Sequence, residues 1–141
     1  MNEQQQQIVD TARSMIGARW RHRGRKAWAV DCIGIMVLSM ESAGIKMRDR
    51  TDYGREPWND GLQREMLEHF GEPVSDDWQA GDVAIVKWAN MPAPSHVAII
   101  ADYPHGGLSL IHAHSSWGVA EHRLDEDWAA MIVEVYRPWA A

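Results

Sequence analysis

The chain has 141 residues, of which 45% are hydrophobic and 24% charged, and this size suits a single domain over residues 1–141 with one buried core. Its net charge of −6 disfavours nucleic acid as a partner. No apolar run reaches the roughly 18 to 20 residues that span a bilayer, and the polar start MNEQQQQIVD predicts no export signal. We therefore expect one domain with no membrane span.

The N-terminal half is predicted to be helical. Apolar residues recur at helical spacing from Gln4 to Ile16. A second, nearly all-apolar segment over Asp31–Ala43 is typical of a buried helix, with Asp31 as its N-cap and a glycine at its end. A polar loop over residues 48–61 then leads to a short third helix over Leu62–Phe70.

The C-terminal half is predicted to form strands, because short apolar runs and period-two patterns alternate there with Pro, Gly, Asp and Asn. The five candidates are Val83–Trp88, His96–Ala101, Leu108–Ala113, Gly118–Arg123 and Ile132–Tyr136. Helices first and strands second favour an α+β fold, in which an antiparallel sheet of about five strands packs against the N-terminal helices.

The single cysteine, Cys32, excludes a disulfide within the chain and a thiolate metal cluster. Its expected place is the first turn of the second helix, where free N–H groups stabilise a thiolate. The same groups could stabilise an oxyanion on an attacked carbonyl. Two interpretations stay open, because free cysteine is also a common buried side chain.

Two histidines on neighbouring predicted strands favour the nucleophile. His96 opens one strand, and His112 ends the strand that follows a Gly106-Gly107 hairpin turn, so the two can be cross-strand neighbours. Such a pair supplies a base and a group that orients its ring. Each histidine taken singly also fits a half-buried side chain with a satisfied hydrogen bond.

The remaining histidines carry weaker signals. His114 shares a strand face with His112, but no acidic or thiol ligand stands beside them at a familiar spacing, so no metal or other cofactor is predicted. His69, His105 and His122 are interpreted as surface residues.

Four ordered motifs resemble the NlpC family of papain-like cysteine peptidases, which cut bacterial cell-wall peptides. They are Asp31-Cys32-Ile33-Gly34-Ile35, Gln79-Ala80-Gly81-Asp82-Val83, Ser95-His96-Val97-Ala98-Ile99 and Ile111-His112-Ala113. The similarity runs from about Gly17 to Pro138. It implies a papain-like core with Cys32 as nucleophile, His96 as general base and acid, and His112 as the residue that orients His96.

The same resemblance implies a substrate pocket, in which Asp31 and Ser95 help to receive the amino end of a muropeptide. A plain N-cap and a plain strand-start residue are the alternative interpretations of these two. Trp20 stands where the family often has Tyr, so it can wall the cleft without a hydroxyl, and His22 is expected to take over some polar work. Ile33 stands where the family commonly has Ser.

Two further segments, Trp20-Arg21-His22-Arg23-Gly24 and Val135-Tyr136-Arg137-Pro138, are most similar to a subgroup found in phage and gene-transfer-agent tails. This predicts a virion-tail enzyme, made in the host cytoplasm and docked on tail-tip or hub proteins. It would act in the periplasm or cell wall on peptidoglycan stem peptides, at the γ-D-glutamyl to diamino acid bond. The eight tryptophans fit cleft walls or burial against a tail partner.

Two alternatives remain at this point. One is a structural tail component with little or no hydrolase activity. The other keeps the papain-like chemistry but uses it to process a tail protein or to transfer an acyl group.

Overall fold

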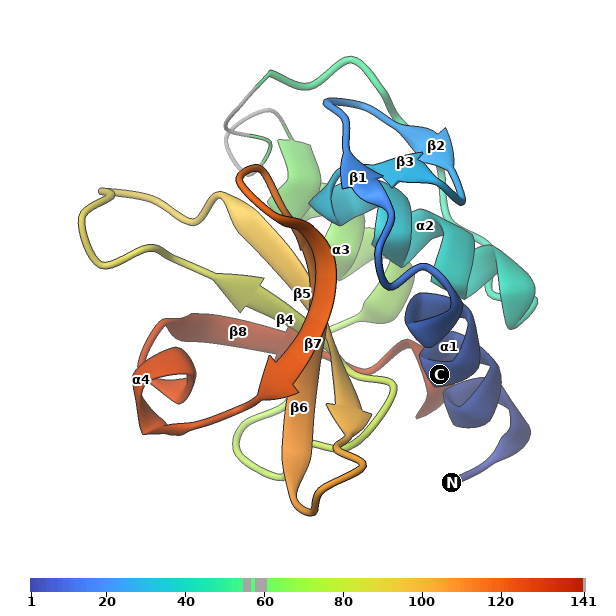
Figure 1. The fold of residues 1–141 in the computed structure, drawn as a ribbon, viewed down its shortest axis with the longest axis vertical. Helices are drawn as coiled ribbons and strands as arrows, with labels where there is room; N and C mark the ends of the chain where they lie inside the picture. The colour runs from blue at the N-terminus through green and yellow to red at the C-terminus, as the bar shows by residue number, and fades with distance from the viewer. Residues whose placement is uncertain (55–56, 58–60, 141) are drawn as a thin grey trace.

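A computed structural model describes residues 1–54, 57 and 61–140 of the chain (Figure 1). Its helices are α1 (Glu3–Ser14), α2 (Cys32–Ser42), α3 (Gln63–Phe70) and α4 (Glu126–Ala129), followed by a 3-10 turn over Pro138–Ala140. Its strands are β1 (Arg19–Trp20), β2 (Arg25–Lys26), β3 (Ala29–Val30), β4 (Val83–Val86), β5 (His96–Asp102), β6 (Leu108–His114), β7 (Gly118–Arg123) and β8 (Ile132–Tyr136). The expected order, with the main helices first and the main strands second, is confirmed.

The main sheet has five strands in the order β7-β6-β5-β4-β8, and all of its neighbours are antiparallel. This confirms the predicted α+β class. A second, three-stranded sheet, β1-β3-β2, was not predicted. Its strands have two residues each, which is too short for a period-two pattern to be visible in the sequence.

The two faces of the main sheet bury different cores. The helix face carries Val97, Ile99 and Ile111, which pack with buried residues of α1 and α2 (Figure 1). The opposite face carries a smaller cluster around Ile100 and Leu110, which tryptophan side chains and residues near α4 cover. Alternation along each strand produces this division, because successive side chains point to opposite faces.

Helix α1 begins with a capping box, in which the Asn2 side chain accepts from the Gln5 backbone N–H and the Gln5 side chain accepts from the Asn2 backbone N–H. Its predicted apolar face is buried at Ile8, Val9, Ala12 and Met15. The prediction was wrong at its last member, Ile16, whose side chain is 47% exposed. The helix ends at Ser14, and the chain turns at Gly17, whose φ of 95° suits glycine.

Helix α2 is buried on nearly all sides, as predicted, and Asp31 is its N-cap because the side chain accepts from the Gly34 N–H. Cys32 is therefore the first residue of the helix. A Cβ placed on Gly34 would lie 2.1 Å from the carbonyl oxygen of Gly24, so the helix touches the preceding loop backbone to backbone. This contact fixes where the helix begins.

Two sequence motifs of the C-terminal half meet in one buried ion pair. Asp82 is fully buried, and the Arg137 guanidinium donates to both of its carboxylate oxygens at 3.0 and 2.9 Å. Trp139 Nε1 and the Gln79 backbone N–H also donate to this carboxylate. The pair holds the end of the chain beside the start of β4, near α1 (Figure 1).

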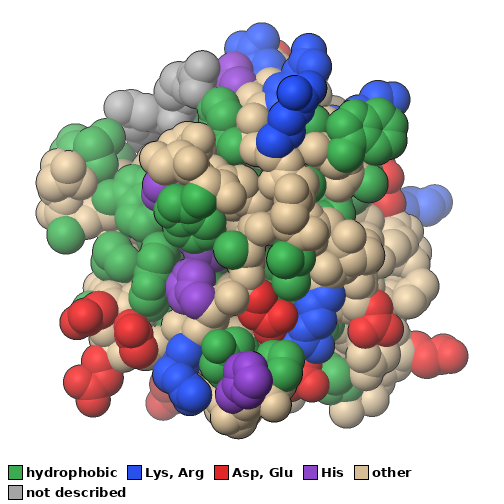
Figure 2. Space-filling model, in the orientation of Figure 1, with side chains coloured by type: hydrophobic (Ala, Val, Ile, Leu, Met, Phe, Trp, Pro, Cys, Tyr) green, Lys and Arg blue, Asp and Glu red, His purple; other side chains and the backbone are tan. Residues whose placement is uncertain are grey.

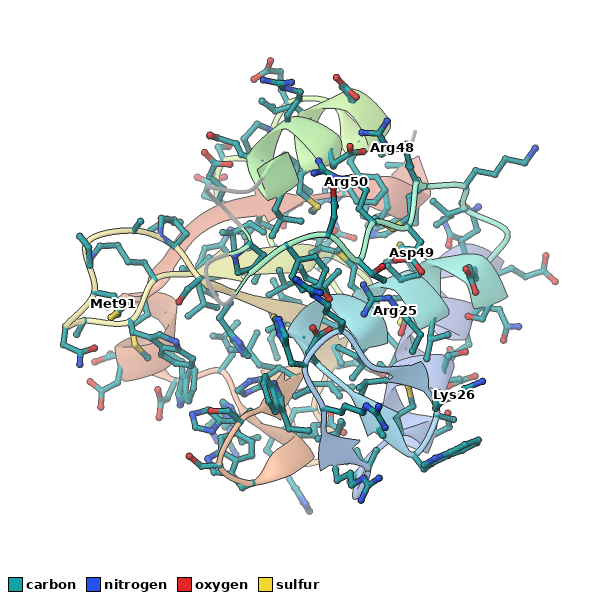
Figure 3. All side chains as sticks on the ribbon, turned by 90° about the horizontal axis from the view of Figure 1, so that it is seen from above. Arg25, Lys26, Arg48, Asp49, Arg50 and Met91 are labelled. Atoms are coloured by element: carbon teal, nitrogen blue, oxygen red, sulfur yellow. The ribbon has the colours of Figure 1, made fainter. Side chains whose placement is uncertain are left out.

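The connections differ most from the prediction. The predicted loop over residues 48–61 falls partly on residues 55–56 and 58–60, which lie outside the described residues; Arg48 and Arg50 of this segment contact Glu65 of α3 (Figure 3). Strand β4 ends at Val86, before the predicted Trp88, because the pairing with β8 shifts register there. Helix α4 was not predicted, since four residues are too few for a helical pattern.

Candidate active site

A cleft of about 240 Å³ lies between the first residue of α2 and the first residue of β5. It brings together six of the seven predicted site residues, namely Trp20, His22, Asp31, Cys32, Ser95 and His96. Tyr53, Trp88 and His114 also line it. The seventh predicted residue, His112, lies behind His96 and contacts its ring.

The Cys32 thiol lies at the N-terminus of α2, and the residue is 8% exposed. Burial raises the pKa of the thiol to about 12, and the charge of Asp31 adds to this. Hydrogen bonds from backbone N–H groups, that of Val97 first, lower the pKa and so oppose the shift. The thiol at rest is therefore neutral, and it shares the lining of the cleft with His96.

His96 and His112 form a buried pair in which His96 Nε2 lies 2.7 Å from His112 Nδ1. Burial lowers the pKa of His96 to about 3 and that of His112 to about 2. Nearby imidazoles lower both values further. Both rings are therefore neutral at rest, and a neutral ring has the free lone pair that a general base needs.

A third histidine extends this pair, and here the sequence interpretation was wrong. His122 was interpreted as a surface residue, yet its ring is half-buried and its Nε2 lies 2.7 Å from His112 Nε2. Its Nδ1 lies 3.0 Å from the carbonyl oxygen of Arg123. The signal was present in the sheet register: because Leu110 pairs with His122 on β7, that ring shares a face with His112.

Three tryptophans surround these histidines. The Trp88 ring lies 4.9 Å from the His96 ring, and the rings of Trp117 and Trp128 lie 5.1 and 5.2 Å from that of His112. Figure 2 shows histidine side chains among hydrophobic ones on the face that carries β7, with acidic side chains gathered over α4. The tryptophan excess thus serves the site in part, while Trp58 lies outside the described residues.

Asp31, on the other side of Cys32, is saturated by donors from the protein. Its Oδ1 accepts from the Gly34 N–H at 2.8 Å and from Arg25 at 3.2 Å. Its Oδ2 accepts from the Tyr53 hydroxyl at 2.6 Å and from the Arg23 N–H at 2.8 Å. The carboxylate therefore fixes the start of α2 and the cleft wall, and its role toward a substrate amine stays a prediction.

The Arg25 guanidinium links this carboxylate to the loop before α3. It also donates to Asp49, beside which it lies (Figure 3), and to the Tyr53 hydroxyl at 2.9 Å. Tyr53 was missed as a site residue because it stands in a polar loop with no periodic pattern. Burial and the hydrogen bond to Asp31 raise the pKa of its hydroxyl, which therefore stays protonated and donates.

The remaining predicted residues form the rim of the cleft. The rings of Trp20 and His22 are stacked with centroids 6.1 Å apart, and Tyr53 meets His22 edge to face. Ser95 lines the cleft and its backbone N–H donates to Val86. Ile33 lines a separate cavity together with Met36 and Val37 of α2 and with Leu62, which precedes α3. These apolar neighbours explain why an apolar residue fits where the family commonly has Ser.

Within the described residues, no group of three or more His, Cys, Asp or Glu side chains is arranged to hold a metal ion. Nor does any helix described there have the length and apolar character needed to cross a bilayer.

A cysteine at the start of a buried helix shares a cleft with a histidine of an antiparallel sheet, and the fold is a papain-like α+β fold. Residues 17–137 match the NlpC/P60 family, and the chain belongs to that family. The expected family is thereby confirmed. No curated protein matches the chain.

Solved structures share this fold at low sequence identity. A Staphylococcus aureus protein described as similar to a lipoprotein of the NLP/P60 family has a TM-score of 0.67 and 20% identity, over 97% of this chain and 42% of that one. NlpC1 from Trichomonas vaginalis has a TM-score of 0.70 and 18% identity, over 98% and 45%. The chain thus spans less than half of these two proteins. The NlpC/p60 domain of peptidoglycan hydrolase SagA has a TM-score of 0.62 and 23% identity, over 96% and 98%.

Proposed function

We propose that this protein is a cysteine endopeptidase that hydrolyses amide bonds in peptidoglycan stem peptides. The observation that carries the proposal is that Cys32 and His96 line one cleft, with His112 behind His96: His96 Nε2 lies 2.7 Å from His112 Nδ1. Membership of the NlpC/P60 family supports this chemistry. The printed name of the similar SagA domain, a peptidoglycan hydrolase, supports the substrate class.

The mechanism follows from the neutral resting state of the site. The thiol proton passes to His96 as the sulfur attacks the amide carbonyl, since burial disfavours a free thiolate before substrate arrives. Backbone N–H groups of the first turn of α2 stabilise the oxyanion. His96 then gives the proton to the departing amine, and in the second half-reaction it takes a proton from water, which hydrolyses the thioester. His112 holds the His96 ring through the Nε2 contact.

A Cys32→Ala variant tests the proposal on purified peptidoglycan. We expect the wild-type protein to release cleaved stem peptides and the variant to release none, because alanine has no nucleophile. His105→Ala serves as a folded control, since this exposed residue lies in the turn between β5 and β6. Mass spectrometry of the soluble products measures the outcome. Equal release by the wild type and by Cys32→Ala would refute Cys32 as the nucleophile, and no release by either protein would favour a structural role.

The bond that we propose as the target joins γ-D-glutamate to the diamino acid of the stem peptide. The test uses two synthetic peptides that differ only in whether glutamate is linked through its γ- or its α-carboxyl. We expect cleavage of the γ-linked peptide alone. Cleavage of both peptides, or of added tail proteins instead, would replace this specificity with that of a processing protease, and products extended by an added amine would indicate acyl transfer.

We also propose that the protein acts from a virion tail, docked on tail-tip or hub proteins. The support is the resemblance of the segments at residues 20–24 and 135–138 to the tail-associated subgroup. Quantitative mass spectrometry of purified particles tests the proposal. A fixed copy number for each particle is the expected result, and recovery only outside the particles would contradict it.

A further inference from the structure

Three imidazoles join end to end across three adjacent strands. His96 on β5 contacts His112 on β6 through Nε2 and Nδ1 at 2.7 Å. His112 contacts His122 on β7 through their Nε2 atoms, also at 2.7 Å. The series, which we call the histidine chain, ends where His122 Nδ1 lies 3.0 Å from the carbonyl oxygen of Arg123. Both nitrogens of His112 and of His122 are thus engaged.

The carbonyl at the end of the chain sets the direction of every hydrogen bond in it. A carbonyl oxygen only accepts, so Nδ1 of His122 must carry a proton. In a neutral ring the other nitrogen then accepts, which requires Nε2 of His112 to donate. Nδ1 of His112 accepts in turn, and Nε2 of His96 donates to it. The lone pair of His96 is left on Nδ1.

This free Nδ1 is the nitrogen that the proposed reaction needs, because Nε2 of His96 is engaged behind the cleft. The opposite direction would place a proton on Nδ1 and remove the base. We infer that His122 is a positioning residue, which, with the Arg123 carbonyl, keeps His96 in the tautomer that accepts the Cys32 proton. The inference deepens the proposed function and rests on it for its catalytic meaning.

The surroundings of His122 support a fixed ring. Its centroid lies 4.5 Å from that of Trp128 and 6.4 Å from that of Trp117. The same two tryptophans pack on His112. Aromatic packing on these rings limits their rotation, so hydrogen bonding decides which nitrogen carries the proton.

Two variants at the same position separate a directional role from simple packing. His122→Phe keeps a ring but gives Nε2 of His112 no acceptor. His122→Gln has a side-chain oxygen that can accept from His112 and an amide that can donate to the Arg123 carbonyl. We expect His122→Phe to lower kcat about tenfold and to leave KM within twofold. The reason is that the preference of His96 for the Nε2–H tautomer would weaken by about the free energy of one buried hydrogen bond. His122→Gln is expected to restore most of this loss.

Long-range ¹H–¹⁵N NMR of the histidine rings tests the inference without any substrate. In the wild-type protein we expect His96 and His112 as Nε2–H tautomers and His122 as the Nδ1–H tautomer. In His122→Phe we expect the His112 and His96 signals to shift toward a mixture, whereas the His105→Ala control should leave them unchanged.

Each outcome of these experiments bears on the inference. A wild-type His96 with its proton on Nδ1, or unchanged tautomers together with unchanged kcat in His122→Phe, would overturn it. If the wild-type protein cleaves no peptidoglycan, the proposed function fails while the tautomer spectra still decide the direction of the chain. If His122→Phe does not fold, the wild-type and His122→Gln spectra still decide it.

Discussion

Two buried polar regions flank the cleft and are built on opposite principles. On one side, the Asp31 carboxylate is held by two main-chain N–H groups, a guanidinium and a phenol. On the other, His96 and His112 of the histidine chain are neutral and are walled by indole rings. Four fixed donors hold the carboxylate in one place, whereas a neutral imidazole can accept a proton and return it. The first region therefore stabilises the fold, and the second has the groups that the proposed chemistry needs.

The strongest test of this contrast removes the carboxylate. Asp31→Ala leaves the Arg25 guanidinium and the Tyr53 hydroxyl without their buried acceptor, and we expect it to reduce the free energy of unfolding by about 3–5 kcal/mol. Asp49→Asn is the matched control, because it removes a more exposed partner of Arg25 and should cost no more than about 1 kcal/mol. Urea titration followed by tryptophan fluorescence measures both changes. Similar values for the two variants would contradict the contrast.

A decrease in pH tests the region that contains His96 and His112. In the unfolded chain His96 and His112 bind protons with a pKa of 6.5. In the folded state burial lowers the pKa of His96 to about 3 and that of His112 to about 2. The contribution of these two residues to the free energy of unfolding is therefore fully present above pH 6.5, and it is lost as the pH falls from 6.5 toward the folded-state pKa values. At pH 5 the expected loss is up to about 2 kcal/mol for each ring. Thermal unfolding between pH 7 and pH 5 measures it, in a range where ordinary carboxyl groups scarcely titrate.

A pH-independent unfolding temperature across this range would show that the two imidazoles take up protons in the folded state as readily as in the unfolded one. The companion variant His112→Phe removes one of the two groups, so its slope with pH should be shallower than that of the wild type.

The variant His112→Phe is expected to have a smaller effect on stability than Asp31→Ala and also to lower activity. His112→Phe preserves an aromatic ring under Trp117 and Trp128 but leaves the facing nitrogens of His96 and His122 without this partner. We expect it to cost about 1–3 kcal/mol at pH 7 and to lower kcat by at least about tenfold. Steady-state kinetics alongside urea titration separates the two quantities. A variant with wild-type kcat would remove His112 from the mechanism.

Much of the framework could be predicted because it rests on local patterns. Residues close together in the sequence determine the apolar run of α2, the Asp31 cap and the period-two strands. The ordered motifs identified the family. The prediction failed where position depends on contacts between distant segments. Tyr53 reaches Asp31 from an irregular loop, and β1, β2 and β3 exist because residues 19–30 fold back on one another.

His122 is an intermediate case. Its surface interpretation followed from its place on a strand next to Glu121. The pairing of His112 with Ala120 across the β6–β7 hairpin places His122 one diagonal step away on the same face. A register assigned to the hairpin from the Gly118 turn would therefore have found it, whereas side-chain type alone did not.

The backbone contact between Gly34 and Gly24 has a consequence for anyone who wishes to redesign the cleft. The sulfur is positioned by main-chain atoms that leave no room for a methyl group, since a Cβ on Gly24 would itself lie 2.5 Å from the Ala29 carbonyl oxygen. Libraries that aim at new amide substrates should therefore leave both glycines alone. They should vary the rim, at Trp20 and His22, where side chains shape the cleft without carrying the nucleophile.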